Sequence, residues 1–322
     1  MRKTPTSLAR CEHAERYVFE LPEGSDRRHF PCQILNRTPT EPLSLKRSNF
    51  SVLMSVYARE TPSFMRESLQ SVVASSVSPD ELVLVEDGPI GAALREVIDD
   101  FRTRLPIRSV PLPVNLGLPG ALNAGLAQCS HEVVARFDTD DICEPTRFER
   151  QLAYLDSHPE VVAVGAAVQE FDMHTGQKLG LRSPPSSHEA LAEFARLSSP
   201  LNHPATMYRK SAVLQVGAYP THMSVAFEDY ALWVRLMLAG YRLANLPEVL
   251  VHMRAGAAQA SRRRGWRYAR QEIGFALEFR RAGFLSVWQC LRFMAFRVPI
   301  RFLPKKQVTA MYRWFGRGRP TP

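Results

Sequence analysis

Short apolar runs alternate with amphipathic segments from residue 50 to residue 171. Apolar runs bounded by turn residues are typical of buried strands, and apolar residues spaced three and four apart are typical of helices. Strands are therefore expected in the ranges 50–57, 81–88, 107–112, 132–138 and 161–171. Helices, one preceded by a loop, are expected in the ranges 61–75, 91–101, 115–128 and 145–159. This alternation predicts an α/β fold with a mainly parallel sheet flanked by helices.

The pattern changes in the second half of the chain. Residues 227–246 predict a helix that opens with two acids and ends at Gly240, followed by a strand. After about residue 255, arginines and aromatic residues mix along helical segments. The stretch 284–303 has about the length of a membrane span, but three arginines interrupt it and Pro299 would kink it. A helix lying in the membrane interface fits better than a span.

Three regions are therefore expected. Residues 1–47 are polar and rich in Pro, Arg and Ser, and a disordered extension is predicted there. Residues 48–255 form the predicted α/β domain, and 256–322 a basic, amphipathic helical tail.

Composition narrows the class of protein. The 322 residues are 45% hydrophobic, which is enough for a large α/β domain with an appendage. The five cysteines show neither a C-x-x-C pair nor a Cys/His spacing, so a disulfide framework and a zinc site are not expected. A reducing compartment fits this cysteine usage. The N-terminus has no continuous apolar segment, so a secretory signal is not expected.

Charge is distributed unevenly. The net charge is +9, yet residues 252–322 alone contain 16 Lys and Arg against two acids, so the rest of the chain is mildly acidic. A basic tail with interleaved Phe, Leu, Trp and Met indicates an anionic membrane surface. Nucleic acid is not expected, because no nucleic-acid-binding module is recognisable. The alternative is a basic helical pair packed on the catalytic domain.

Polar residues recur where the predicted strands end. They are Tyr57, Asp87, Asn115 and the aspartates of "RFDTDDICEP" at residues 136–145. In open α/β sheets, ligands bind beyond the carboxyl ends of the strands. We therefore expect these side chains to meet at one site.

The aspartate cluster has two interpretations. An EF-hand is excluded, because a loop starting at Asp138 has Cys143 where that motif needs glycine. A carboxylate site for Mg²⁺ or Mn²⁺ that bridges to a diphosphate fits the oxygen ligands. The other interpretation is an acidic turn before the helix that follows Pro145.

Two further acidic motifs keep two interpretations each. "VEDG" can hydrogen-bond a base or ribose where glycine lets a ligand approach, or it can cap a helix. Glu228 and Asp229 in "FEDYALW" can provide a general base, or can simply favour a helix N-terminus. Neither a dinucleotide-binding glycine motif nor a P-loop is present.

Several motifs together resemble family 2 glycosyltransferases with the GT-A fold. They are "FSVLMSVYARETPSFMRESLQSV", "DELVLVEDGP", "NLGLPGALNAGL", "VVARFDTDDICEPTRFERQLAYL", "NHPATMYRKSAV", "VGAYP" and "FEDYALWVRL". The tail is similar to the subgroup that builds bacterial capsule, O-antigen and exopolysaccharide, including amylovoran-type enzymes. The resemblance covers about residues 49–315.

The resemblance implies a role for each matching position. Donor-binding residues would be Val56, Tyr57, Asp87, Asn115, Gly117, Asn123, Arg136 and Asp138. Asp140 would be the main metal ligand, and Asp141 is an acid without an assigned role. Asp229 would be the catalytic base, with Glu228 as its neighbour.

Acceptor or phosphate contacts are implied less directly. His203 either faces the acceptor or is a loop histidine bonded to backbone. Arg262, Arg263 and Arg264 would contact a diphosphate or a lipid phosphate.

The resemblance also implies an activity. A sugar would pass from a nucleoside-diphosphate donor, UDP before others, to a lipid-linked saccharide at the inner face of the cytoplasmic membrane. The reaction would use Mg²⁺ or Mn²⁺ and invert the anomeric carbon. Two alternatives remain at this point: a phosphotransferase or phosphatase using the same aspartates, and a membrane protein that binds nucleotide-sugar without turnover.

Overall fold

The computed structural model describes residues 47–222, 227–255 and 265–303. Contacts divide the chain into a unit of residues 1–45 and a unit of residues 46–322, and every described residue belongs to the second. The extension predicted for residues 1–47 therefore lies outside the described residues, except for Arg47.

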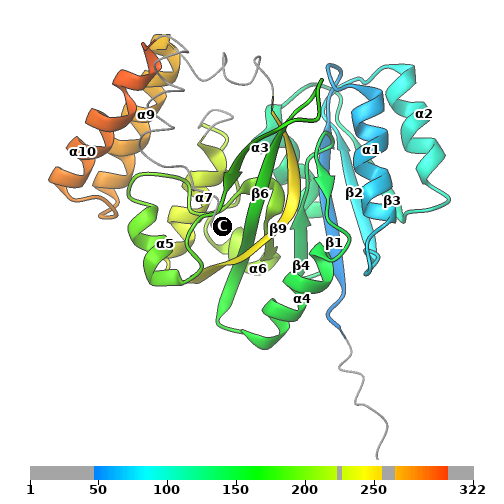
Figure 1. Cartoon of the computed structure of the whole chain (residues 1–322), viewed down its shortest axis with the longest axis horizontal. Coiled ribbons are helices and arrows are strands. Elements are labelled where there is room, and N and C mark those ends of the chain that lie inside the picture. The colour runs from blue at the N-terminus through cyan, green and yellow to red at the C-terminus, as the bar shows by residue number, and fades with distance from the viewer. Residues whose placement is uncertain (1–46, 223–226, 256–264, 304–322) are drawn as a thin grey trace, which may run out of the picture. The chain divides into compact units, whose positions relative to one another are not determined.

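One nine-stranded sheet organises the second unit (Figure 1). Its strands are β1 (Phe50–Val56), β2 (Glu81–Glu86), β3 (Ile107–Pro111), β4 (Val133–Arg136), β5 (Ile142–Cys143), β6 (Val161–Asp172), β7 (Lys178–Arg182), β8 (Met207–Arg209) and β9 (Arg242–Ala255). The strand order is β3-β2-β1-β4-β8-β6-β9-β5, and β7 pairs with β6.

The helices follow the expected amphipathic segments. They are α1 (Pro62–Val73), α2 (Ala92–Phe101), α3 (Gly117–Gln128), α4 (Arg147–Ser157), α5 (His188–Phe194), α6 (Lys210–Gln215), α7 (Glu228–Leu238), α9 (Gly265–Arg281) and α10 (Val287–Arg297). Two short 3₁₀ helices are η1 (His203–Ala205) and η2 (Pro299–Arg301). The predicted α/β class is confirmed.

The strands β1 to β4 form the parallel half of the sheet. Val56 at the end of β1 pairs with Glu86 at the end of β2, and Glu86 pairs with Pro111 at the end of β3. Because the register is level, the carboxyl ends of these strands meet at one edge, as the sequence predicts.

The other half of the sheet adds antiparallel pairs. The three residues of β8 run antiparallel to both β4 and β6, while β6 and β9 are parallel to each other. A strand this short carries little periodicity, so the sequence pattern did not predict β8. Its effect is to place η1 and the start of β8 beside the end of β4.

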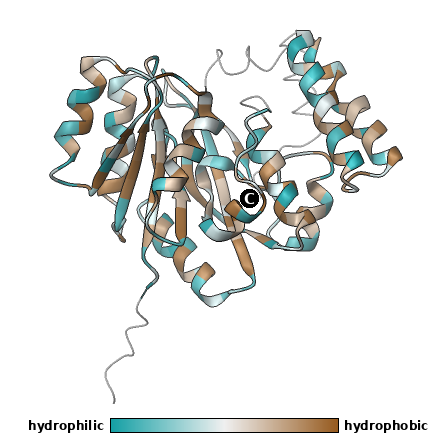
Figure 2. Cartoon of the chain, turned by 180° about the vertical axis from the view of Figure 1, so that it is seen from behind, coloured by the Kyte–Doolittle hydropathy of each residue, from teal (hydrophilic) through white to brown (hydrophobic). Residues whose placement is uncertain are grey.

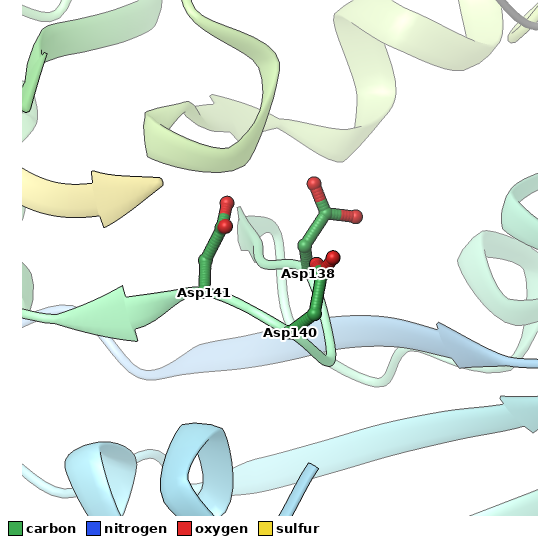
Figure 3. Close-up of side chains that lie close together, drawn as sticks. All are labelled: Asp138, Asp140 and Asp141. Atoms are coloured by element: carbon green, nitrogen blue, oxygen red, sulfur yellow. The ribbon is translucent and has the colours of Figure 1, made fainter. Parts of the chain in front are cut away.

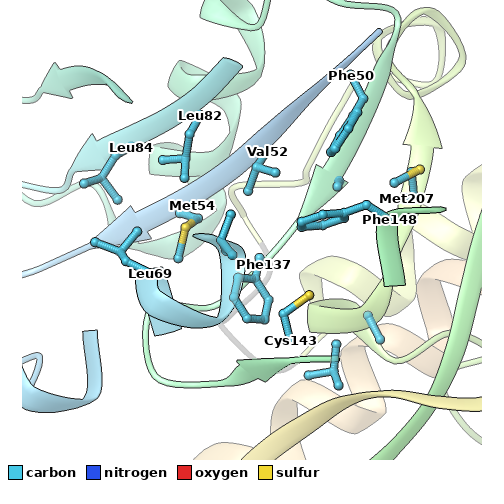
Figure 4. Packing of buried hydrophobic residues seen from close by; sticks show 14 of the residues in the cluster. Phe50, Val52, Met54, Leu69, Leu82, Leu84, Phe137, Cys143, Phe148 and Met207 are labelled. Carbon is cyan, nitrogen blue, oxygen red and sulfur yellow. The ribbon is translucent and has the colours of Figure 1, made fainter. Parts of the chain in front are cut away.

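Two apolar clusters cover the two faces of the sheet. Alternate residues of a strand point to opposite faces, so Val52 and Met54 join one cluster and Leu53 the other. The first cluster includes residues of α1, α2 and α4, and Figure 4 shows Phe148 of α4 packed on Phe50. The second includes residues of α3, α6 and α7. Figure 2 shows that the strands between these helices are strongly hydrophobic.

A third apolar cluster joins the tail helices to α7. Tyr230 of α7 packs against Phe275 of α9, and Phe275 stacks on Phe293 of α10 at 5.5 Å between ring centroids. This packing agrees with the predicted alternative of a basic helical pair on the catalytic domain. Among the described residues, none of the helices combines the length and hydropathy that crossing a membrane requires.

Candidate active site

Three aspartates gather on the loop between β4 and β5 (Figure 3). Carboxylate oxygens of Asp138, Asp140 and Asp141 lie within 4.8 Å of one another. Burial, and then the charge of Asp138, raise the pKa of Asp140 to about 6. Burial and both neighbours raise the pKa of Asp141 well above its usual value. Such crowding favours a compensating cation.

Main-chain contacts hold this loop in place. The Ser68 hydroxyl on α1 donates to the Asp138 carbonyl at 2.9 Å. From β9, the Arg254 Nε donates to the Asp140 carbonyl at 2.6 Å, and the Arg254 backbone N–H donates to Asp141 Oδ1 at 2.9 Å. The second carboxylate oxygen of Asp141 is buried, with no hydrogen-bond donor among the described residues. Asp141, for which the sequence suggested no role, thus both anchors the loop and offers one oxygen.

Arg254 is a site residue that sequence reasoning missed. Its guanidinium lies over Phe64 and Phe171, with centroid distances of 4.3 and 5.1 Å, and forms an ion pair with Glu67. The residue is 4% exposed, so its charge is committed to these contacts. Its burial depends on the pairing of β9 with β5, which the sequence pattern does not show.

Replacing Arg254 with Met is expected to weaken Mn²⁺ binding about 10- to 100-fold, the usual effect of losing a contact that orients a metal ligand. The thioether can fill the aromatic slot but cannot donate to the Asp140 carbonyl. Calorimetric Mn²⁺ titration measures the effect. Arg66→Met is the matched control, because Arg66 forms an exposed ion pair with Asp100 on the neighbouring helix face. Equal Mn²⁺ affinity in both variants would exclude the positioning role.

Arg136 at the end of β4 is buried, with 1% of its surface exposed, and pairs with Asp138. Its Nε and Nη1 are buried without a hydrogen-bond acceptor among the described residues. A second buried arginine, Arg147 of α4, donates to the Arg136 carbonyl at 2.6 Å and to Gln151 at 3.1 Å. Arg147 lies on the apolar face of α4, which is the signal that could have identified it.

The ends of β2 and β3 form a second edge of the site. Asp87 accepts a hydrogen bond from the Leu116 N–H at 2.6 Å, and the Asn115 side chain donates to the Asp87 carbonyl at 3.0 Å. Gly88 has a φ of +81°, and an added Cβ would lie 2.8 Å from the Asn115 nitrogen, so only glycine fits. Gly117 begins α3 with a φ of +76°.

The first strand contributes to the same edge. Val56 is buried and Tyr57 half-buried, and the Asp87 N–H donates to the Val56 carbonyl at 2.8 Å. Val56, Tyr57, Asp87, Asn115 and Gly117 therefore meet, as expected from their places at strand ends.

Asn123 has a more specific structural task. Its side chain donates to the Tyr219 carbonyl at 2.8 Å and accepts from the Tyr219 N–H at 2.9 Å. The Tyr219 hydroxyl lies 3.1 Å from His203 Nε2. His203 is buried, and burial together with the charge of Arg136 lowers its pKa well below the usual range. Its ring is therefore neutral and bonded to a tyrosine rather than to backbone.

Glu228 and Asp229 begin α7 on the same side as Arg136. Glu228 is 3% exposed and accepts from the Phe227 N–H at 3.1 Å, while Asp229 is half-buried and lies 3.5 Å from the Ser199 hydroxyl. Burial, and then the charge of Asp229, raise the pKa of Glu228 to about 8, although the positive charge of Arg136 opposes this rise. Asp229 is thus the more accessible acid of the pair.

The unfolding free energy of the wild-type protein is expected to fall as pH rises, and Glu228→Gln is expected to prevent the part of this fall that Glu228 causes. The folded protein keeps the Glu228 proton up to about pH 8, whereas the unfolded chain releases it near the ordinary pKa of 4.5. The folded state therefore binds more protons between these values, and its stability falls through that window. The unfolding free energy of the variant should exceed that of wild type by about 2 kcal/mol or more near pH 9, with little difference near pH 5.

Urea unfolding at both pH values measures this difference. Glu96→Gln, at an exposed position of α2, is the control and should show no such pH-dependent gain. A pH-independent difference for Glu228→Gln would contradict the assignment.

The remaining candidate positions, Arg262, Arg263 and Arg264, lie outside the described residues. Of the described candidates, the aspartate cluster and the Glu228–Asp229 pair come from motifs about 90 residues apart in sequence. Arg136 connects them, since its charge acts on both Asp138 and Glu228.

Comparison with known proteins places this site in context. The family model described as "Glycosyl transferase family 2" matches residues 51–217. The chain is 43% identical over 259 residues to the amylovoran biosynthesis glycosyltransferase AmsE of Erwinia amylovora, covering 79% of this chain and 96% of the relative. It is 37% identical over 255 residues to an Escherichia coli enzyme named UDP-Gal:alpha-D-GlcNAc-diphosphoundecaprenol beta-1,3-galactosyltransferase, covering 79% and 92% of the two chains.

A solved structure supports the fold. The mannosyltransferase PcManGT from Pyrobaculum calidifontis, in complex with GDP-Man and Mn²⁺, superposes with a TM-score of 0.60 at 16% identity. The match covers 86% of this chain and 78% of the other. The predicted GT-A fold is thereby confirmed.

Proposed function

The chain belongs to glycosyl transferase family 2, and from this membership we propose that it transfers a sugar from a nucleoside diphosphate to a hydroxyl of a lipid-linked saccharide, with inversion, during synthesis of a cell-surface polysaccharide. The observation that carries the proposal is that Arg136 pairs with Asp138 of the aspartate cluster and that its charge also acts on Glu228. We therefore assign a donor-side acid group and a candidate base to one site.

The residues present fit a divalent cation. Asp138 and Asp140 provide half-buried carboxylates, and Asp141 provides a buried oxygen that has no hydrogen-bond donor in the described part of the chain. Hard oxygen donors of this kind suit Mg²⁺ or Mn²⁺. Asp140 is proposed as the main ligand, with Asp138 towards ribose and diphosphate. When bound, such a cation stabilises the negative charge that gathers on the leaving nucleoside diphosphate.

Binding of the donor falls to the ends of the parallel strands. We assign the base of the nucleotide to Asp87 and the pocket wall to Val56 and Tyr57. The loop at Asn115 and Gly117, fixed against Asp87, shapes the nucleoside side of the site. Arg136 balances the charge of Asp138 and lies within electrostatic reach of Asp140. We propose that these contacts orient the nucleotide-sugar donor before the acceptor binds.

Asp229 is proposed to remove the proton from the acceptor hydroxyl as that oxygen attacks the anomeric carbon. Its half-buried carboxylate is accessible, whereas buried Glu228 keeps its proton near neutral pH. A neutral Glu228 leaves the pair with one negative charge, on the residue that must accept the proton. A single displacement at the anomeric carbon would invert its configuration.

Acceptor and location are proposed from the relatives. The E. coli relative is named for a diphosphoundecaprenol-linked acceptor, and we propose an acceptor of that class here. Its lipid would hold the reaction at the inner face of the cytoplasmic membrane. His203 and, beyond the described residues, Arg262–Arg264 are proposed for the acceptor side.

A donor panel tests the proposal. The full chain, incubated with Mn²⁺, a lipid-diphosphate saccharide and UDP-, GDP- or dTDP-sugars, should release one nucleoside diphosphate in step with product. NMR of the product should show inversion. Trapping of an aspartyl-phosphate would instead support phosphotransfer by the same aspartates. Donor binding without turnover, across the whole panel, would support a non-catalytic binding protein.

A further inference from the structure

Helix α10 has apolar side chains on two faces, and only one of these faces packs against other helices of the described chain. Cys290 and Phe293 are buried in the cluster shared with α9 and α7. The opposite face carries Val287, Trp288, Leu291 and Phe296, which are 50%, 81%, 47% and 57% exposed. We call these four residues the α10 face. Figure 2 shows hydrophobic segments along this helix.

The orientation of α10 is fixed by specific contacts. Ser286 and Gln289 form a capping box at its start, with the Gln289 N–H donating to the Ser286 hydroxyl at 3.2 Å. At its end, Arg297 donates to Glu272 of α9 at 2.8 Å and to the Leu197 carbonyl at 2.9 Å. Since these contacts set the rotation of the helix, the exposure of the α10 face is a property of the fold.

The exposed charges that form no ion pair on the described part of the tail helices are positive. Residues 265–303 contain two acids, Glu272 and Glu278, and seven arginines. Glu272 is buried and bound by Arg297 and Arg301, while Glu278 lies 3.3 Å from His222 and 3.6 Å from Arg235. The other five arginines are exposed and form no ion pair within the described part of the chain: Arg267, Arg270, Arg280, Arg281 and Arg292.

We propose that the α10 face, with Arg280, Arg281 and Arg292, docks on an anionic lipid bilayer and enters its interface. Apolar and aromatic side chains at helical spacing suit the boundary between headgroups and acyl chains, and a tryptophan is favoured there. Arginines beside them bind anionic headgroups. A second copy of this chain is a poorer occupant, because a two-fold contact would oppose arginine to arginine.

This surface lies one helix layer from the proposed base. Phe227 and Tyr230, on either side of Glu228 and Asp229, pack on Tyr268 and Phe275 of α9. Docking by α10 would therefore hold the start of α7 near the membrane. That consequence rests on the proposed lipid-linked acceptor, whereas the docking surface itself does not.

Vesicle flotation of the full chain tests the surface. The probes are vesicles of phosphatidylcholine with about one third phosphatidylglycerol, and vesicles of phosphatidylcholine alone. Leu291→Glu is expected to lower the partition into anionic vesicles about 10- to 100-fold, because it removes an exposed leucine that would enter the bilayer and adds a charge that anionic headgroups repel. Leu214→Glu is the matched control, since Leu214 on α6 is also 47% exposed, and it should partition as wild type.

A triple variant isolates the charge. Arg280→Gln, Arg281→Gln and Arg292→Gln together should reduce binding roughly 100-fold at low salt, at about fivefold per arginine, with a weaker effect at high salt. The tryptophan emission of wild type, to which Trp288 contributes, should shift to the blue on anionic vesicles, and Leu291→Glu should show no such shift.

Three results would overturn the proposal. The first is flotation of Leu291→Glu equal to that of wild type, and the second is equal binding of wild type to neutral and anionic vesicles. The third is a wild-type dimer in solution that does not bind vesicles and that dissociates in Leu291→Glu. Circular dichroism and thermal unfolding of each variant confirm that it is folded. Flotation requires no turnover, so vesicle binding without sugar transfer would contradict the proposed activity alone. Transfer activity without vesicle binding would contradict the surface alone.

Discussion

Asp140→Asn is expected to lower the rate of sugar transfer about 10³-fold or more, which corresponds to roughly 4 kcal/mol of lost transition-state stabilisation. The variant keeps the size of the side chain but loses the charge that would hold a cation opposite the departing diphosphate. The loop itself should persist, because Ser68 and Arg254 bind the carbonyls of Asp138 and Asp140 rather than the Asp140 side chain. Product formation at saturating donor, over a range of Mn²⁺ concentrations, measures the effect.

Metal removal gives the complementary result. Chelation with EDTA should abolish transfer by wild type, and added Mn²⁺ or Mg²⁺ should restore it. Asp99→Asn, on the exposed surface of α2, is the control for loss of one carboxylate and should retain full activity. Full activity of Asp140→Asn would rule out its assignment as the main ligand.

Asp229→Asn is expected to reduce transfer about 10²- to 10⁴-fold while donor affinity stays within a few-fold of wild type. Asparagine keeps the start of α7 intact but cannot accept the acceptor proton. The difference should appear in kcat rather than in the dissociation constant of the donor. Nucleotide binding by calorimetry and steady-state transfer across pH separate the two quantities.

Two variants frame this result. Asp100→Asn, with its side chain 47% exposed on α2, controls for charge and should transfer as wild type. Ser199→Ala removes the hydroxyl 3.5 Å from Asp229 and should cost only a few-fold, since it affects the position of the carboxylate and not its chemistry. A normal rate for Asp229→Asn would show that another group takes the proton.

Most of the fold could be predicted from hydrophobic periodicity. The strands β1, β2 and β3 and the helices α1, α2, α4 and α7 lie within the ranges that the pattern indicated, and β6 extends one residue beyond its range. Each is long enough to show its period, and each buries one face or stripe. The pattern did not predict the short strands β5, β7 and β8 or the short helices α5 and α6. Short elements show little periodicity, and the positions of these strands depend on their pairing partners in the sheet.

The candidate site was predictable only in part. Asp87, Asn115 and Asp138 could be identified because strand ends in a parallel sheet share one edge. Arg147 and Arg254 were missed, because an arginine in a helix or strand usually reaches solvent. The position of Arg147 on the apolar face of α4 was a signal in the sequence, whereas the burial of Arg254 depends on contacts with segments distant in sequence. The tail was predicted as an interfacial helix or as a packed pair. Its packed face is observed, and docking of its other face on a membrane stays a proposal.

Hydrophobic periodicity establishes the α/β class and the order of the strands that carry polar residues at their ends, and the successive motifs establish the reaction class. The protonation of the site acids, in contrast, follows from contacts that exist only in the folded chain. Burial, which arises only in the folded chain, and neighbouring charge raise the pKa of Asp140, Asp141 and Glu228. The Arg254 N–H of β9 donates to Asp141, and the charge of Arg136 on β4 acts on Glu228. Those contacts join residues far apart in the chain, and protonation depends on the surroundings of a side chain rather than on its place in a motif.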